Sequence, residues 1–228
     1  MSVSEDRTVQ PAPAASAPAS GIADPGPLGL AAFALTTFLL SARNAGWMTS
    51  TTGNAFLTFA LAYGGLAQLL AAMWEFRKGN VVGTTGFGTF GAFWIGIALW
   101  VLLVVNPTVA AAVKAPLTLP ATVTDINHEL AWILLGFAIF TLYATILISQ
   151  TNTALFTTFL LLFITLVVLV IGQFNAGTAG PLTPTTTIKI GGYIGLITAL
   201  AAWYTSAAGM AAGIGGPLRL PVGPPLVK

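Results

Sequence analysis

The sequence predicts an all-α membrane protein folded as a bundle of six transmembrane helices. Of its 228 residues, 56% are hydrophobic and 6% are charged, whereas a soluble domain carries about 25% charged residues. Six runs approach the roughly 20 apolar residues that a helix needs to cross about 30 Å of hydrocarbon. Small residues recur at four-residue spacing, as in Ala60 with Gly64 and Gly191 with Gly195, which predicts close helix packing.

The expected spans are 28–42, 55–74, 87–105, 130–148, 154–171 and 190–208. The first is the shortest, and it crosses a bilayer only if its helix continues toward Trp47 or the bilayer thins locally. The segment from about Asn106 to Asn127 carries three prolines and is expected to be a long loop. Five Lys and Arg residues fall on the side of the termini and three on the other side, which favours cytoplasmic termini.

Composition divides the chain into three parts. Residues 1–23 are rich in Ala, Pro and Ser and cannot bury enough apolar surface to order themselves, so they are expected to form a disordered tail. The six-helix transmembrane domain is expected over 24–210. Residues 211–228 are rich in Pro and Gly and are expected to form a flexible C-terminal tail.

Composition also excludes several functions. The chain has no cysteine and a single histidine, so disulfides, thiolate ligands and a histidine-built metal site are not expected. The eight Lys and Arg residues form no large patch, which argues against nucleic-acid binding. Asp125, His128 and Glu129 form an acid-base group, but no hydrolase motif surrounds them. We expect neither an enzyme nor a cofactor.

The polar residues inside the expected spans are neutral, and Thr36, Asn44 and Gln68 are among them. Such donors suit a small neutral solute, or an anion that loses its water stepwise. They are equally typical of hydrogen bonds between helices. Glu75 ends the second span beside Arg77 and Lys78, so it forms either a salt bridge or a proton-coupling site.

The first span opens with the residues Asp24-Pro25-Gly26-Pro27-Leu28-Gly29-Leu30. The first backbone N–H groups of a helix have no partner within the helix, and the helix dipole places partial positive charge there. This end is therefore suited to an anion. The alternative is a helix start capped by proline, with no further role.

Two blocks of the sequence resemble the acetate uptake transporter family, the acetate/succinate-proton symporters. The first block combines Asp24-Pro25-Gly26-Pro27-Leu28-Gly29-Leu30, Phe33-Ala34-Leu35-Thr36-Thr37-Phe38 and Asn44-Ala45-Gly46. The second comprises Tyr63-Gly64-Gly65-Leu66-Ala67-Gln68, Trp74-Glu75-Phe76-Arg77-Lys78-Gly79-Asn80 and Gly91-Ala92-Phe93-Trp94. The resemblance extends over roughly residues 24 to 208.

The resemblance implies a homo-hexamer of six-helix protomers in the cytoplasmic membrane, each with its own path for acetate or related short carboxylates and for protons. It implies an apolar constriction formed by Phe33, Phe90 and Leu162. From the residues themselves, we expect substrate contacts at Leu28, Gly29, Leu30, Thr36, Asn44 and Gln68, with Asp24 and Glu75 as candidates for proton coupling. Two positions depart from the family pattern, because Asp24 stands where asparagine is usual and Phe90 where tyrosine is common.

Three functions stay open at this stage. The first is a proton-linked carrier or a channel for acetate and related carboxylates, possibilities that the sequence does not separate because both need the same narrow path. The second is a membrane sensor or assembly protein that transports nothing. The third is a pore for a small neutral solute such as urea or ammonia.

Overall fold

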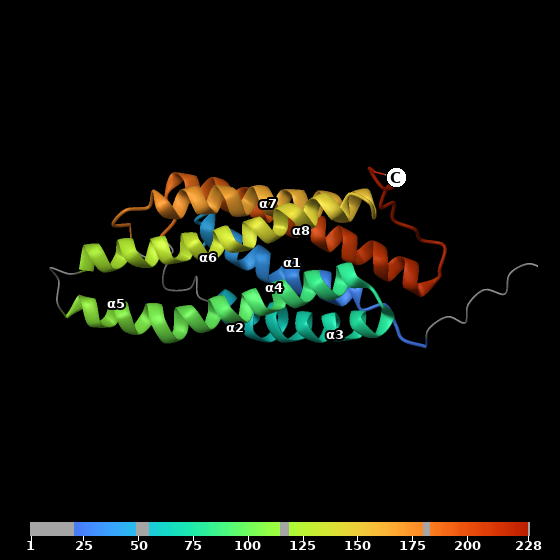
Figure 1. The fold of residues 1–228 in the computed structure, drawn as a ribbon, viewed down its shortest axis with the longest axis horizontal. Helices are drawn as coiled ribbons and strands as arrows, with labels where there is room; N and C mark the ends of the chain where they lie inside the picture. Colours follow the sequence, from blue (N-terminus) through green and yellow to red (C-terminus); the bar gives the residue numbers. More distant parts are fainter. Residues whose placement is uncertain (1–20, 49–54, 115–118, 180–182, 228) are drawn as a thin grey trace, which may run out of the picture.

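The computed structural model describes residues 21–48, 55–114, 119–179 and 183–227. Within them, six helices are long and apolar enough to cross a membrane (Figure 1). Each of the six expected spans lies inside one of these helices, so the prediction of a six-span all-α membrane protein is confirmed. Nearly all of the expected N-terminal tail, 1–23, lies outside the described residues.

The six spans are built from ten helical segments. The first span is α1 (Gly26–Asn44), and the second joins α2 (Ala55–Leu61), the π-helical stretch η1 (Ala62–Ala67) and α3 (Gln68–Lys78). The third joins α4 (Val81–Trp100), the π-helical stretch η2 (Val101–Val105) and α5 (Asn106–Val113). The remaining spans are α6 (Leu119–Ile148), α7 (Thr153–Phe174) and α8 (Thr186–Ile214).

The prediction of a long loop between the third and fourth spans is wrong for most of the segment. The chain is helical up to Val113 and again from Leu119. Pro107 follows the π-helical stretch η2 inside the continuous third span, and Pro120 is the second residue of α6. At a helix start such as that of Pro120, a missing N–H costs no helical hydrogen bond. Pro120 therefore marks a helix start, whereas Pro107 lies within a continuous helix. Asp125 lies inside α6 instead of at its mouth.

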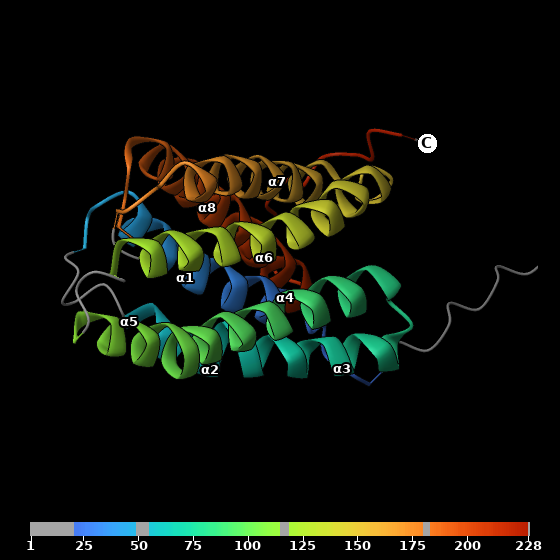
Figure 2. The ribbon, with the colours of Figure 1, turned by 60° about the vertical axis from the view of Figure 1, so that its left-hand side comes forward.

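The helices form two groups with α1 between them. On one side α3 packs along α4, and on the other α6, α7 and α8 pack in sequence order (Figure 2). The closest helix pairing joins α1 to α8, where Gly192 makes the approach possible. A Cβ at Gly192 would overlap backbone atoms of Asn44 and Ala45, so only glycine fits there.

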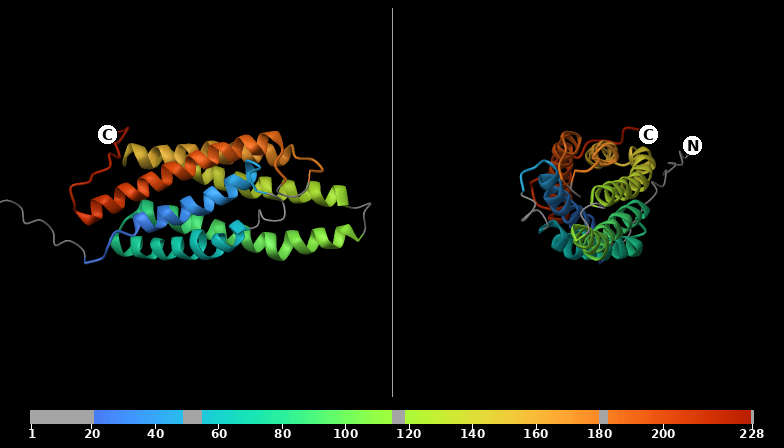
Figure 3. Two further views of the ribbon diagram at one scale, coloured as in Figure 1. Left: turned by 180° about the vertical axis from the view of Figure 1, so that it is seen from behind. Right: turned by 90° about the vertical axis from the view of Figure 1, so that its left-hand side faces the viewer.

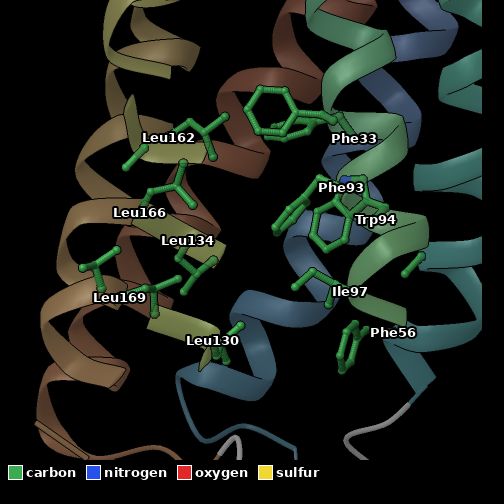
Figure 4. Packing of buried hydrophobic residues seen from close by; sticks show 14 of the residues in the cluster. Phe33, Phe56, Phe93, Trp94, Ile97, Leu130, Leu134, Leu162, Leu166 and Leu169 are labelled. Atoms are coloured by element: carbon green, nitrogen blue, oxygen red, sulfur yellow. The ribbon is translucent and has the colours of Figure 1, made fainter. Parts of the chain in front are cut away.

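The buried core lies between the two groups of helices. Figure 4 shows Leu162, Leu166 and Leu169 of α7 on one side of it and Phe33, Phe93 and Trp94 on the other. Many large apolar side chains on the outer faces are exposed, among them Leu70, Met73, Leu103, Ile146, Ile197 and Leu200. An apolar exterior of this kind is what a helix bundle in lipid requires.

The segment 215–227, expected to be flexible, is held against the bundle. The Ala154 N–H donates to Val222 O at 2.8 Å, the Thr153 hydroxyl donates to Pro224 O at 2.7 Å, and the Leu226 N–H donates to Ser149 O at 2.8 Å. We call this segment the C-terminal strap. Helix α8 also continues to Ile214, beyond the expected boundary at 210. The strap and the start of α1 lie at the same end of the bundle (Figure 3), so we call this the terminal end.

Candidate functional site

Three neighbouring cavities extend from the terminal end into the bundle. The largest, of about 360 Å³, opens at the terminal end, and we call it the vestibule. Its walls come from the start of α1, the ends of α3 and α8, the first turns of α4 and α7, and the strap. Two smaller cavities follow, the middle chamber of about 20 Å³ and the distal chamber of about 40 Å³.

Asp24 lies at the vestibule wall and fills the anion site that the sequence predicts at the start of α1. Its Oδ1 atom accepts a hydrogen bond from the Gly26 N–H at 3.1 Å. The same atom forms an ion pair with Lys78 Nζ at 2.8 Å. This link ties the start of α1 to the end of α3. The helix start is therefore occupied by a carboxylate of the protein itself.

Glu75 lines the same vestibule and is only 1% exposed. Its Oε2 atom accepts a hydrogen bond from Asn80 Nδ2 at 2.9 Å. A Cβ on Gly83 would lie 2.6 Å from the Glu75 carboxyl carbon, so the glycine makes room for this side chain. Of the alternatives predicted for Glu75, the salt bridge is wrong, because the ion pair observed in the described part of the chain joins Lys78 to Asp24.

Gln68 lines the middle chamber. Its side chain is 1% exposed, and its Oε1 atom has no hydrogen-bond partner within the described residues. Gln68 is the first residue after η1, and π-helical turns often occur at functional sites. A buried amide oxygen without a partner is costly for folding alone. As an acceptor, it suits a solute that carries an O–H or N–H group.

Phe33, Phe90 and Leu162 separate the middle chamber from the distal chamber, since all three line both. The Phe33 and Phe90 rings meet edge to face with centroids 5.6 Å apart. Leu162 comes from α7 and faces Phe33 across the interior (Figure 4). The three residues that the sequence assigns to a constriction thus lie together at an apolar narrowing.

The distal chamber is lined by Asn44, which is 4% exposed, and by Thr37 and Trp94. The Thr37 Oγ1 and Trp94 Nε1 atoms have no hydrogen-bond partner within the described residues. Polar residues thus surround the distal chamber too, but these two atoms are buried and not open to it.

Three of the predicted substrate contacts lie elsewhere. Leu28 is 46% exposed on the outer surface, and Gly29 is packed so tightly that a Cβ would lie 2.7 Å from the Phe87 ring. The Thr36 hydroxyl donates to Ala32 O at 3.1 Å, within its own helix. Leu30, by contrast, lines both the vestibule and the middle chamber.

Sequence reasoning missed two aromatic residues between the vestibule and the middle chamber, Phe87 and Phe159, which line both cavities. Phe87 is a large aromatic residue that follows a run of Gly and Thr at the start of α4. This difference in size from its neighbours could have identified it from the sequence. Phe159 lies in the mostly apolar helix α7 as one of several Phe and Leu residues, and no signal distinguishes it from them. Within the described residues, no three His, Asp or Glu side chains gather as metal ligands would.

Comparison with known proteins agrees with this architecture. The chain is 38% identical over 202 residues to acetate permease A of Emericella nidulans, covering 89% of this chain and 66% of that protein. It is 35% identical over 197 residues to ammonia transport outward protein 2 of Saccharomyces cerevisiae, covering 86% of this chain and 64% of that protein. The chain thus spans just under two thirds of the length of these relatives.

A solved structure described as the bacterial acetate channel SatP superposes with a TM-score of 0.70 at 28% identity, covering 89% of this chain and 99% of that one. The model of the GPR1/FUN34/yaaH family matches residues 6–224, which is nearly the whole sequence. This chain is therefore a multi-pass membrane protein that belongs to the GPR1/FUN34/yaaH family.

Proposed function

We propose that the protein moves acetate and related short carboxylates, succinate among them, across the cytoplasmic membrane. The observation that carries this proposal is the run of cavities from the terminal end, narrowed between Phe33, Phe90 and Leu162. An anion that passes an apolar narrowing must give up water, so small size and partial protection by neutral polar groups favour passage. The names of the acetate permease and of the acetate channel support the same substrate class.

Within this path, Leu30, Gln68 and Asn44 are the proposed substrate contacts. Gln68 lines the middle chamber and Asn44 lines the distal chamber, so the N–H groups of the two amides are the proposed donors to a carboxylate on the two sides of the narrowing. Gly29 and Thr36 act through helix packing, whereas Leu28 lies on the outer surface.

Glu75 is the better candidate than Asp24 for coupling transport to protons. The Glu75 carboxyl is buried beside a neutral donor, Asn80, whereas Asp24 is held by Lys78. Glu75→Gln keeps the shape and the hydrogen-bonding capacity but cannot release a proton. It should remove the effect of a proton gradient on uptake, whereas Asp24→Asn should keep that effect.

We further propose a homo-hexamer with both termini in the cytoplasm. The resemblance to the acetate uptake transporter family supports the assembly, and the excess of Lys and Arg at the terminal end supports the orientation. Native mass spectrometry from a mild detergent tests the assembly, and a strictly monomeric species that still transports would refute it.

The decisive experiment is uptake of radiolabelled acetate into proteoliposomes, with and without an inward proton gradient. Uptake driven by the acetate gradient alone indicates a channel, and accumulation that needs the proton gradient indicates symport. No uptake in either condition would reject carboxylate transport and favour a sensor or assembly role.

One observation favours a second candidate, ammonia conduction, because a relative of similar identity is named as an ammonia transporter. The same vesicles decide between the two. An ammonia pulse that changes the internal pH faster than in empty liposomes, together with absent acetate uptake, would establish the second candidate.

A further inference from the structure

The vestibule carries an unfavourable charge for an anion. Its charged lining residues within the described chain are Asp24 and Glu75, and both are acids. An ionised carboxylate at the mouth of a low-dielectric cleft repels an incoming acetate and attracts cations. A path for carboxylates therefore needs a nearby positive charge.

Lys78 provides that charge. Its ammonium group lies 2.8 Å from Asp24 Oδ1, and the side chains of Lys78 and Asp24 are 25% and 48% exposed, respectively. The pair is thus partly shielded from solvent at the rim of the vestibule. We propose that Lys78 sets the charge selectivity of the vestibule, because it offsets Asp24 and so allows carboxylates to enter.

Two other cationic side chains at the terminal end, Arg219 and Arg77, form no ion pair with the vestibule wall within the described residues. Arg219 of the strap donates to Ala212 O at 3.3 Å, at the C-terminal end of α8. Arg77 precedes Lys78 in the sequence and is exposed, but the ion pair to the vestibule wall comes from Lys78. Arg77 is therefore a matched control, since it carries the same charge on the same helix end without contacting a vestibule residue through an ion pair.

The inference rests on the proposed carboxylate transport, so its first test uses acetate uptake by Lys78→Met, Asp24→Asn, the double variant and Arg77→Met. At low ionic strength, we expect Lys78→Met to lower initial uptake about 3- to 10-fold. Asp24→Asn should raise it, since asparagine still accepts from the Gly26 N–H. The double variant should return close to wild type, and Arg77→Met should change little.

Ionic strength separates an electrostatic role from a structural one. At about 1 M salt the screening length falls to about 3 Å, so the deficit of Lys78→Met should shrink toward wild type. A variant that is merely misfolded would keep its deficit. A double variant as poor as Lys78→Met, or a deficit independent of salt, would overturn the proposal.

A second readout does not depend on transport. Because the chain has no cysteine, Ala212→Cys places a single thiol in the vestibule wall. The rates of its modification by anionic and cationic methanethiosulfonates of similar size report the local potential. Lys78→Met should lower the anionic-to-cationic rate ratio about 3- to 10-fold, and Asp24→Asn should raise it.

The two readouts distinguish the possible failures. If wild type takes up no acetate but the rate ratio shifts as expected, carboxylate transport is wrong and Lys78 still sets the charge preference of the vestibule. If wild type takes up acetate but the ratio is unaffected by Lys78→Met, the role of Lys78 is rejected and the proposed function stands.

Discussion

The rings of Phe33 and Phe90 meet edge to face with their centroids 5.6 Å apart, at the boundary between the middle and distal chambers. Phe90 also contacts Phe140 and Phe159, at 5.7 and 6.3 Å between centroids. A ring held by other rings on several helices has little freedom to move. The aliphatic side of the narrowing, Leu162, is therefore the part that most easily changes its width.

The first prediction concerns Leu162→Ala, which removes three carbon atoms from the narrowing. Uptake should extend to longer acids such as lactate and butyrate, because both size exclusion and the length of the dry zone decrease. Leu162 is 6% exposed, so a loss of about 2 to 5 kcal/mol in unfolding free energy is expected. Uptake competition by a graded series of acids, normalised to folded protein, measures the effect.

Leu166→Ala is the matched control for this prediction. Leu166 is similarly buried on the same helix, but it lines the distal chamber and not the middle one. It should lose comparable stability and keep the size cutoff. If both variants shift the cutoff equally, or neither does, Leu162 does not define the narrowing.

The second prediction is that Gln68→Leu lowers acetate uptake while the protein remains as stable as wild type or becomes more stable. The Gln68 Oε1 atom is buried without a partner among the described residues, so its replacement removes a polar group that folding leaves unsatisfied. Thermal unfolding in detergent and uptake are measured on the same preparation.

Gln173→Leu serves as the control, since Gln173 also has a buried, unpartnered Oε1 atom but lines neither the middle nor the distal chamber. It should keep its uptake. Equal losses of stability and uptake in Gln68→Leu would mean that this amide packs between helices and does not contact the solute.

The spans were predictable because hydrocarbon imposes a length and a composition on each helix. The helical ends of the third and fourth spans were not predictable, because proline usually interrupts a helix. Here Pro120 fits a first turn, and Pro107 follows the π-helical stretch η2 within a continuous helix. The strap was missed for a similar reason. Its hydrogen bonds are made by backbone groups of residues such as Val222 and Leu226, and composition does not show them.

The grouping of candidate site residues was predictable where a side chain carries chemistry or belongs to a motif, while their roles stay predictions. Phe33, Phe90 and Leu162 lie together, and Gln68 lines the neighbouring chamber. The ion pair of Asp24 with Lys78 was not predicted, since 54 residues separate the partners and only the crossing of α1 and α3 brings them together. Thr36 was misjudged because a hydroxyl in a helix satisfies itself on its own backbone.

The third prediction tests the contact of α1 with α8. Gly192→Ala should prevent stable folding or cost about 3 kcal/mol or more, because the added methyl group meets backbone atoms that cannot rotate away. Gly136→Ala is the control, since nothing lies within 4 Å of a Cβ there, and it should gain about 0.5 to 1 kcal/mol. Comparable melting temperatures for the two variants would contradict the close approach.

The fourth prediction concerns the strap and Gly223→Ala. Gly223 has φ of 73°, and a Cβ would lie 2.7 Å from the Thr153 Cβ. A left-handed backbone costs a residue with a side chain about 1 to 2 kcal/mol, so the detached form of the strap should become about 5- to 30-fold more populated. Arg219 lies in the strap and is exposed, so trypsin cleavage after Arg219 in detergent should accelerate accordingly.

Gly216→Ala is the control for this prediction. Gly216 lies in the same segment and is not one of the glycines with a positive φ. A Cβ added to Gly216 would meet only Ile214, at an ordinary contact distance of 3.8 Å. It should be cleaved at the wild-type rate. Acetate uptake by Gly223→Ala should stay within about two-fold of wild type, because the vestibule of about 360 Å³ is far wider than the chambers of about 20 and 40 Å³ that follow it. Faster cleavage with a large change in uptake would instead make the strap part of the rate-limiting passage.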